Sequence, residues 1–383
     1  MRKILLATTA LVAFAGAAQA ADSPVSVNVG GYVDFRAGHF SEATNNNSGA
    51  VDRRNSDFET EYRLNIAAEG KASNGIEYGG LVSLWNGAVY NAANGENGVR
   101  MDQAYVWLSG NWGKVVLGDD HGASDLNIYA PTVGEGQVDG TYTDFTDPTT
   151  LMQFKPGFIH ETENSTKVTY YTPKVGNDKH KVQIGVSYAP NFYDQGQNVV
   201  KYESSSSPMY RDAVEATAQY NGNWSPVNTV VSASLASASN GYTGSVRDFT
   251  AWGLGAQAMY AGFTFGGSYF DAGSFNTLAG QDNNQDVWSL GVKYEFDKVA
   301  VALNGLSGKG YNNLFAVAGT GADANYVDDF KALGLGATYT WFPGLTTAAD
   351  LVFFGQDRAD QIGGVSADKN YGHVVTIAQK ITF

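Results

Sequence analysis

The final thirteen residues, Tyr371–Phe383, alternate in polarity and constrain the fold more than any other segment. One face carries apolar side chains and the other carries small or polar ones: Val375, Ile377, Ile381 and Phe383 against Thr376, Ala378, Lys380 and Thr382. A period of two predicts a β-strand, because successive side chains leave opposite faces of the backbone. Terminal residues usually fray, whereas a strand that closes a barrel has a reason to stay ordered to its end. The segment therefore predicts the closing strand of a β-barrel.

The N-terminal segment 1–20 is typical of a secretory signal peptide, with two basic residues, an apolar core and a small-x-small cleavage sequence. We expect its removal, so that the mature chain begins at Ala21. The formal net charge of −14 would fall to −16, because Arg2, Lys3 and no acid are lost. Residues 21–383 show no shift in composition, which predicts a single domain.

The composition excludes several classes of protein. The chain has no Cys, so it has neither disulfides nor thiolate metal sites, and its acidic balance argues against binding nucleic acid. No apolar run of helical-span length follows residue 20, which excludes a helical membrane protein. A β-barrel can cross a bilayer with a mean hydropathy of −0.24, since only alternate residues meet lipid.

Alternation of the same kind recurs along the whole chain and predicts 16 strands. Many of the apolar faces end in Tyr, Trp or Phe, as an aromatic girdle would. Short turns alternate with long polar connections, which is the connectivity of an outer-membrane barrel. Sixteen strands enclose an aqueous channel, whereas eight would be filled by side chains. The predicted fold is an all-β, 16-stranded antiparallel transmembrane barrel with strands at 25–38, 58–70, 76–86, 99–110, 114–118, 164–172, 181–190, 211–221, 227–238, 248–260, 263–271, 285–296, 299–307, 329–341, 345–356 and 371–383.

At this level of detail the chain resembles the general diffusion porins of the Gram-negative outer membrane, and its leader resembles those of the alphaproteobacterial type. The resemblance rests on the order and spacing of short segments: Gly31–Asp34, Glu61–Leu64, Gln103–Gly110, Asn111–Gly118 and Asn164–Tyr170. It implies export through the periplasm, insertion by the barrel assembly machinery, and a homotrimer surrounded by outer-membrane lipid and lipopolysaccharide. It also implies that the terminal Phe383, with its strand neighbour Ile381, is part of the assembly signal.

The resemblance further implies that the third long loop, about residues 119–163, folds into the barrel and narrows it. This loop has a single cation, Lys155, and nine acids: Asp119, Asp120, Asp125, Glu135, Asp139, Asp144, Asp147, Glu161 and Glu163. In the family the glycine at Gly118 is commonly followed by an arginine that points into the constriction. Here Asp119 follows, so a carboxylate replaces a basic wall residue.

The charged residues predict a cation-selective, water-filled channel for ions and small hydrophilic solutes. Carboxylates in a narrow pore concentrate cations and repel anions. The candidate selectivity residues are seven loop acids and three wall residues: Asp119, Asp120, Asp125, Glu135, Asp139, Asp144, Asp147, Arg36, Arg63 and Glu61. We expect Arg36 and Arg63, on neighbouring early strands, to form a positive side opposite the acidic loop.

Three alternative functions stay open from the sequence. One is a soluble secreted β-protein with a structural or adhesive role. A substrate-specific porin for sugars or cationic nutrients would use an aromatic stacking track, for which Tyr105, Trp107 and Trp85 are candidates. An outer-membrane barrel enzyme would need a Ser-His-Asp set. His121, Ser124 and Asp125 are adjacent only in sequence, so we expect no enzymatic activity.

Two further expectations concern single sites. No cofactor is predicted, although Asp119, Asp120 and Asp125 are candidate calcium ligands, because clustered loop carboxylates are suitable oxygen donors.

Gln379 lies on the outward face of the last strand, where an unpaired amide in lipid would be costly. We expect Gln379 to form a hydrogen bond with a neighbouring subunit.

Overall fold

The computed structural model describes residues 25–44, 54–86, 99–134, 141–146, 162–192, 195, 210–240, 246–275, 277, 284–311, 326–360 and 369–383. The predicted signal peptide and the candidate residues Glu135, Asp139 and Asp147 lie outside these ranges. No helix among the described residues is long and apolar enough to span a membrane. The two helical turns that they contain are 3-10 turns, η1 (Ala123–Leu126) and η2 (Thr141–Phe145).

The strands form one antiparallel sheet in which strands pair with their sequence neighbours, except that β6 and β7 do not pair with each other, and β1 also pairs with β17. Two strands, β6 and β7, both pair with β8 and together form one interrupted strand of the barrel wall. Counted in this way, the barrel has sixteen strands. The strands are β1 (Val25–Thr44), β2 (Ser56–Lys71), β3 (Glu77–Trp85), β4 (Arg100–Gly110), β5 (Gly113–Asp119), β6 (Thr166–Tyr171), β7 (Val175–Gly176), β8 (His180–Asn191), β9 (Tyr210–Asn223), β10 (Asn228–Asn240), β11 (Phe249–Tyr260), β12 (Phe263–Gly273), β13 (Gln285–Phe296), β14 (Val299–Tyr311), β15 (Tyr326–Phe342), β16 (Leu345–Asp360) and β17 (Lys369–Thr382). The predicted closed barrel is confirmed.

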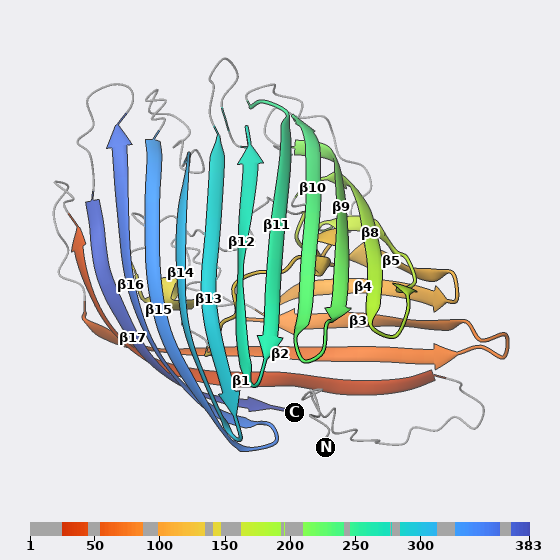
Figure 1. The fold of residues 1–383 in the computed structure, drawn as a ribbon, viewed down its shortest axis with the longest axis horizontal. Helices are drawn as coiled ribbons and strands as arrows, with labels where there is room; N and C mark the ends of the chain where they lie inside the picture. The colour runs from red at the N-terminus through yellow and green to blue at the C-terminus, as the bar shows by residue number, and fades with distance from the viewer. Residues whose placement is uncertain are drawn as a thin grey trace.

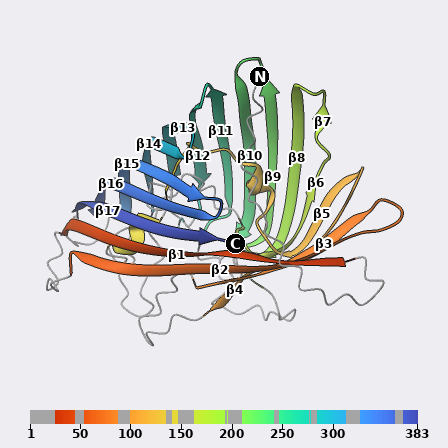
Figure 2. The same ribbon diagram turned by 90° about the horizontal axis from the view of Figure 1, so that it is seen from below.

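Strands on opposite sides of the barrel run at steep angles to each other. In Figure 1, strands β8 to β13 stand side by side while β1 to β3 run across the lower part of the view. Strands of a closed barrel tilt against its axis, so opposite walls are inclined in opposite directions. Figure 2, seen from below, places the last strand β17 beside β1, where the ring closes.

The closing seam follows the sequence prediction to the last residue. The β1–β17 register runs from Tyr32 opposite Thr382 to the far ends of both strands. Beyond it, the Phe383 amide donates to the Gly31 carbonyl at 3.0 Å, and the Gly31 amide donates to the Phe383 carbonyl at 2.8 Å. Gly31 has a φ of +152°, and a Cβ there would lie 2.0 Å from the Arg63 carbonyl oxygen. This position therefore requires glycine.

The two faces of each strand differ as the alternation predicted. On β1, Val33 and Phe35 are exposed on the outside, while Asp34 and Arg36 are buried on the inside. The predicted strand ends are less accurate than the strands themselves. The structure extends β1 to Thr44 and adds the two-residue strand β7, because polar residues at strand ends interrupt the period on which the prediction depended.

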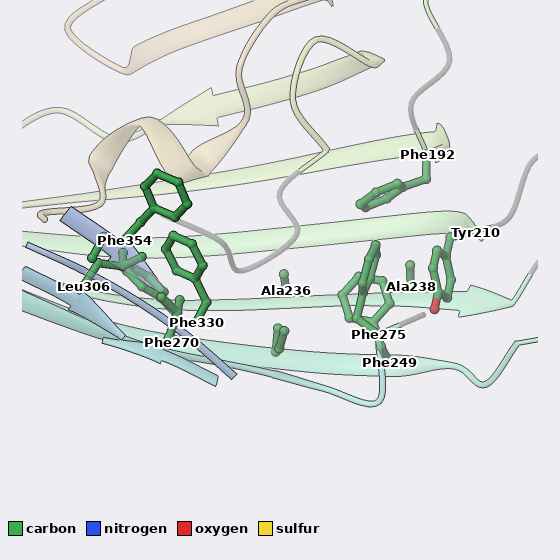
Figure 3. Packing of buried hydrophobic residues seen from close by; sticks show 14 of the residues in the cluster. Phe192, Tyr210, Ala236, Ala238, Phe249, Phe270, Phe275, Leu306, Phe330 and Phe354 are labelled. Carbon is green, nitrogen blue, oxygen red and sulfur yellow. The ribbon is translucent and has the colours of Figure 1, made fainter. Parts of the chain in front are cut away.

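An apolar cluster on the inner face is the part of the fold that alternation did not predict. Its members lie near the strand ends that the long connections join, from β8 round to β1. Figure 3 shows Phe192, Tyr210, Phe249 and Phe275 packed together, and ring centroids in this group lie 4.9–6.0 Å apart. The turn η2 joins the same cluster through two ring contacts, Tyr142 with Phe354 and Phe145 with Phe40. The cluster therefore gives one end of the barrel an apolar core.

Candidate channel lining and constriction

Among the wall cations whose burial the structure describes, Arg36 on β1 is the most enclosed, with 1 % of its surface exposed. Its guanidinium contacts three wall carboxylates, those of Asp34 at 2.7 Å, Glu61 at 2.9 Å and Glu59 at 3.2 Å. A fourth carboxylate, Asp144 of η2, lies at 3.8 Å. Cross-strand register explains the wall contacts, because Arg36 lies opposite Glu59 and Asp34 lies opposite Glu61. Wall acids and a loop acid therefore surround the Arg36 charge, and a role for Arg36 on a positive side of the passage stays a prediction.

Arg63 belongs to a second group, in which cations and an indole alternate across three strands. Arg63 on β2 lies opposite Trp85 on β3, which lies opposite Arg100 on β4. The guanidinium carbons of Arg63 and Arg100 lie 5.5 Å and 4.7 Å from the centre of the Trp85 ring. Arg63 also pairs with Asp102 at 3.0 Å, and the Trp85 indole donates to Glu61 at 3.1 Å. The Trp85 ring thus has cations over it and does not offer the open stacking surface that the sequence suggested.

Tyr105 and Trp107 lie on the inner face of β4, as their parity predicted. Their neighbour Val106 is exposed on the outside of the barrel. The Lys114 ammonium lies 5.2 Å from the centre of the Trp107 ring, so a cation also occupies one face of this ring. A role for Tyr105 in solute stacking stays a prediction.

Three acids at the start of the long loop differ in their environments. Asp119 accepts a hydrogen bond from Thr166, and buried Asp120 accepts one from Gln103 at 2.9 Å. Asp125 is exposed. Burial first, and then the charge of Asp125, raise the pKa of Asp120 to about 6.

Calcium binding by these acids is not supported. In the part of the chain that the structure describes, no group of three or more His, Cys, Asp or Glu side chains is arranged to hold a metal ion. Asp119 and Asp120 lie next to each other in the chain, yet each carboxylate is hydrogen-bonded to a different neighbour.

The backbone of residues 123–130 is fastened to side chains of five strands. Three of its amides donate to wall serines and two of its carbonyls accept from wall glutamines. The pairs are Ala123 with Ser187 (3.2 Å), Ile128 with Ser232 (2.8 Å), Ala130 with Ser289 (3.3 Å), Leu126 with Gln219 (2.9 Å) and Tyr129 with Gln257 (2.8 Å). These partners come from β8, β10, β13, β9 and β11, so the segment runs across the strands rather than away from them.

Gln379 is exposed on β17, as predicted, but its amide has partners within its own chain. Its nitrogen donates to the Thr346 carbonyl at 2.8 Å, and its oxygen accepts from the Thr347 hydroxyl at 2.7 Å. The Trp341 indole donates to the same hydroxyl at 2.9 Å. A neighbouring subunit is therefore not required to satisfy this amide.

Two buried charged residues at the base of the loop, Lys167 and Glu215, were not singled out from the sequence. The alternation of side chains along a strand would have placed both on the inner face, because their neighbours Val168 and Val214 are apolar and lie exposed on the outer face. Parity does not reveal their partners, which belong to distant parts of the chain.

Comparison with known proteins agrees with this architecture. A family model described as Gram-negative porin matches residues 7–359. Among solved structures, an anion-selective porin from Comamonas acidovorans is 14% identical with a TM-score of 0.56, covering 94% of this chain and 100% of its own. A Salmonella typhi OmpF complex with daunomycin is 14% identical with a TM-score of 0.56, covering 93% and 97%. The trimer form of OmpT from Vibrio cholerae is 11% identical with a TM-score of 0.55, covering 94% and 100%. No curated protein matches the sequence.

The solved structures, at these identities, establish the fold alone. The family match extends over most of the chain and agrees with the sixteen-stranded barrel that closes between Gly31 and Phe383. The chain belongs to the Gram-negative porin family and forms a channel in the outer membrane.

Proposed function

We propose that this porin is a passive diffusion channel that prefers cations and admits small hydrophilic solutes. The observation that carries the proposal is the surplus of acid around Arg36. Four carboxylates, those of Asp34, Glu59, Glu61 and Asp144, lie within 4 Å of one guanidinium, so acidic groups outnumber the cation that they contact. Fixed negative charge in a narrow aqueous passage raises the local cation concentration and excludes anions.

The selectivity we propose depends on a narrow passage, because salt screens charge beyond about 8 Å at physiological ionic strength. We propose that loop 119–163 provides the constriction. In support, residues 123–130 are hydrogen-bonded across five strands, and η2 reaches the opposite part of the ring, where Asp144 approaches Arg36 and Phe145 packs on Phe40. A loop anchored at both places would cross the interior and bring its acids near the path of ions.

Swelling of liposomes that contain the purified protein tests the proposal. A neutral pentose, lysine and glutamate are suitable solutes, because the two amino acids are similar in size and opposite in charge. We expect all three to enter, and lysine to enter faster than glutamate. Swelling no faster than that of protein-free vesicles would reject a diffusion channel, and faster entry of glutamate would reject cation preference.

The biological context that we propose follows from the family. Cleavage after residue 20 would give an N-terminal Ala21, which sequencing of the mature protein would identify. Assembly as a homotrimer is supported by the Vibrio cholerae relative that was solved in a trimer form. Export through the periplasm, insertion by the barrel assembly machinery and contact with lipopolysaccharide belong to the same proposal. A detergent-stable band of three times the monomer mass, lost on heating, is the expected result.

The alternative functions receive less support. A sugar-specific track is weakened by the cations over Trp85 and Trp107. Family and fold indicate a channel rather than an enzyme. The hydroxyl of Ser124 is buried without a hydrogen-bond partner in the described structure, so His121 does not activate it.

A further inference from the structure

The two ends of the long loop are held against the same part of the inner wall by side chains of β6, β8 and β9. The Lys167 ammonium of β6 donates to the Asp120 carbonyl at 2.5 Å and also to the Glu163 carbonyl. One buried cation therefore bridges the backbone that enters the loop and the backbone that leaves it. Lys167 is 4 % exposed, so water competes little for these bonds.

A buried acid makes the matching connection to backbone amides. Glu215 of β9 is 1 % exposed, and one of its carboxylate oxygens accepts from the Thr162 amide at the far end of the loop. Its other oxygen accepts from the Ser187 hydroxyl of β8 at 2.8 Å. The Ser187 oxygen in turn accepts from the Ala123 amide at 3.2 Å. Glu215 is thus bonded to one loop end directly and to the other through Ser187.

The backbone between these contacts fits the wall closely. A Cβ on Gly122 would lie 1.9 Å from a carboxylate oxygen of Glu215, so glycine permits this approach. The Tyr171 hydroxyl donates to the Gly122 carbonyl at 2.8 Å. The cation faces carbonyls and the anion receives hydrogen from amide and hydroxyl groups, so each charge meets the backbone or side-chain dipole that stabilises it.

We propose that Lys167, Glu215, Ser187 and Tyr171 form a clasp that fixes the base of the loop and thereby sets the conductance and ion selectivity of the channel. These four are positioning residues, because they act on permeating ions through the placement of the loop acids. The proposal rests on the proposed function, in which loop 119–163 forms the constriction. Hydrogen bonds to charged groups are strong enough that losing one shifts a local equilibrium by about tenfold or more.

The experiment compares four proteins in planar bilayers at 0.15 M KCl: the wild type, Glu215→Leu, Glu215→Gln and Thr217→Val. Glu215→Leu removes both acceptors at similar volume. Glu215→Gln keeps an oxygen for the Thr162 amide and a nitrogen that can donate to the Ser187 oxygen. Thr217→Val is the matched control, because Thr217 is buried on the same face of β9 and its hydroxyl has no hydrogen-bond partner in the described structure.

We expect Glu215→Leu to insert as a heat-modifiable barrel, to spend about tenfold more time in conductance levels other than the main one, and to lose part of its preference for K⁺ over Cl⁻. Glu215→Gln and Thr217→Val should match the wild type. Wild-type conductance and selectivity in Glu215→Leu would overturn the proposal, as would an equal change in Thr217→Val. If Glu215→Leu does not fold, Ser187→Ala, which cuts only the bond to Ala123 and the link to Glu215, should show the same change, and wild-type behaviour there would overturn the clasp.

A fifth protein, Asp125→Asn, separates the clasp from the function on which it rests. This acid is exposed and lies just beyond the clasp. A lower cation preference in Asp125→Asn together with unchanged Glu215→Leu would reject the clasp alone. An unchanged cation preference in both variants would reject the constriction as well.

Discussion

Asp120 predicts a cation preference that depends on pH near neutrality. Its carboxyl is buried next to Gln103, and burial together with Asp125 raises its pKa to about 6. At pH 7.5 about 97% of such a group is ionised, and at pH 5 about 10%. Lowering the pH therefore removes most of one negative charge per channel, while carboxyls with ordinary pKa values near 4 stay mostly ionised.

The size of the effect follows from Coulomb's law. A single charge about 8 Å from a passing K⁺ contributes about 0.5 kcal/mol in water, and about 0.2 kcal/mol after screening at physiological salt. The local K⁺ concentration then falls by about 1.4- to 2.4-fold when Asp120 is protonated, and Cl⁻ rises by the same factor. The permeability ratio of K⁺ to Cl⁻ should decrease by about two- to sixfold between pH 7.5 and pH 5.

Reversal potentials measured at a series of pH values give this ratio directly, and Asp120→Asn is the control. The variant should have a lower cation preference at pH 7.5 and a smaller decrease between pH 7.5 and pH 5 than the wild type. A transition of the same size in Asp120→Asn would refute the assignment. Stability should change in a related way. The folded pKa lies above the unfolded value near 4, so the stabilisation by protonated Asp120 is complete below pH 4 and is lost as the pH rises through about 6.

Three substitutions test the wall and the seam. Gly31→Ala places a Cβ 2.0 Å from the Arg63 carbonyl oxygen, so we expect loss of the heat-modifiable band on gels, whereas Gly305→Ala, whose Cβ meets nothing closer than 3.6 Å, should fold. Arg36→Met leaves the surrounding carboxylates without their cation and should lower the free energy of unfolding by about 3–5 kcal/mol in a urea titration; an unchanged midpoint would contradict the ion-pair geometry. Gln379→Leu removes an amide that is bonded within its own chain, so we expect an unchanged melting temperature of the trimer, and a lower one would indicate a contact with a neighbouring subunit.

The strands were predictable because their outward faces are consistently apolar. Val27, Val29, Val33 and Phe35 follow a period of two that only Gly31 interrupts, and all four are exposed in the structure. Lipid selects this pattern along every strand, so a single sequence contains it many times over. The same alternation continues to Phe383, where β17 and β1 close the barrel.

The interior was less predictable, because its contacts depend on register and on segments far apart in the chain. Parity placed Arg36 on the inner face, but only the alignment of β1 with β2 brings Glu59 and Glu61 to its guanidinium. The approach of Asp144 depends on where η2 lies, which no local pattern encodes. Lys167 could likewise be placed inside but not beside two carbonyls from opposite ends of the loop.

The reversal potential across a KCl gradient in a planar bilayer tests the central claim most directly. Purified protein is inserted at neutral pH with a higher KCl concentration on one side. The surplus of carboxylates around Arg36 and at the start of the loop predicts a reversal potential with the sign expected for a channel that passes K⁺ more readily than Cl⁻. A potential of the sign set by Cl⁻ would contradict the account.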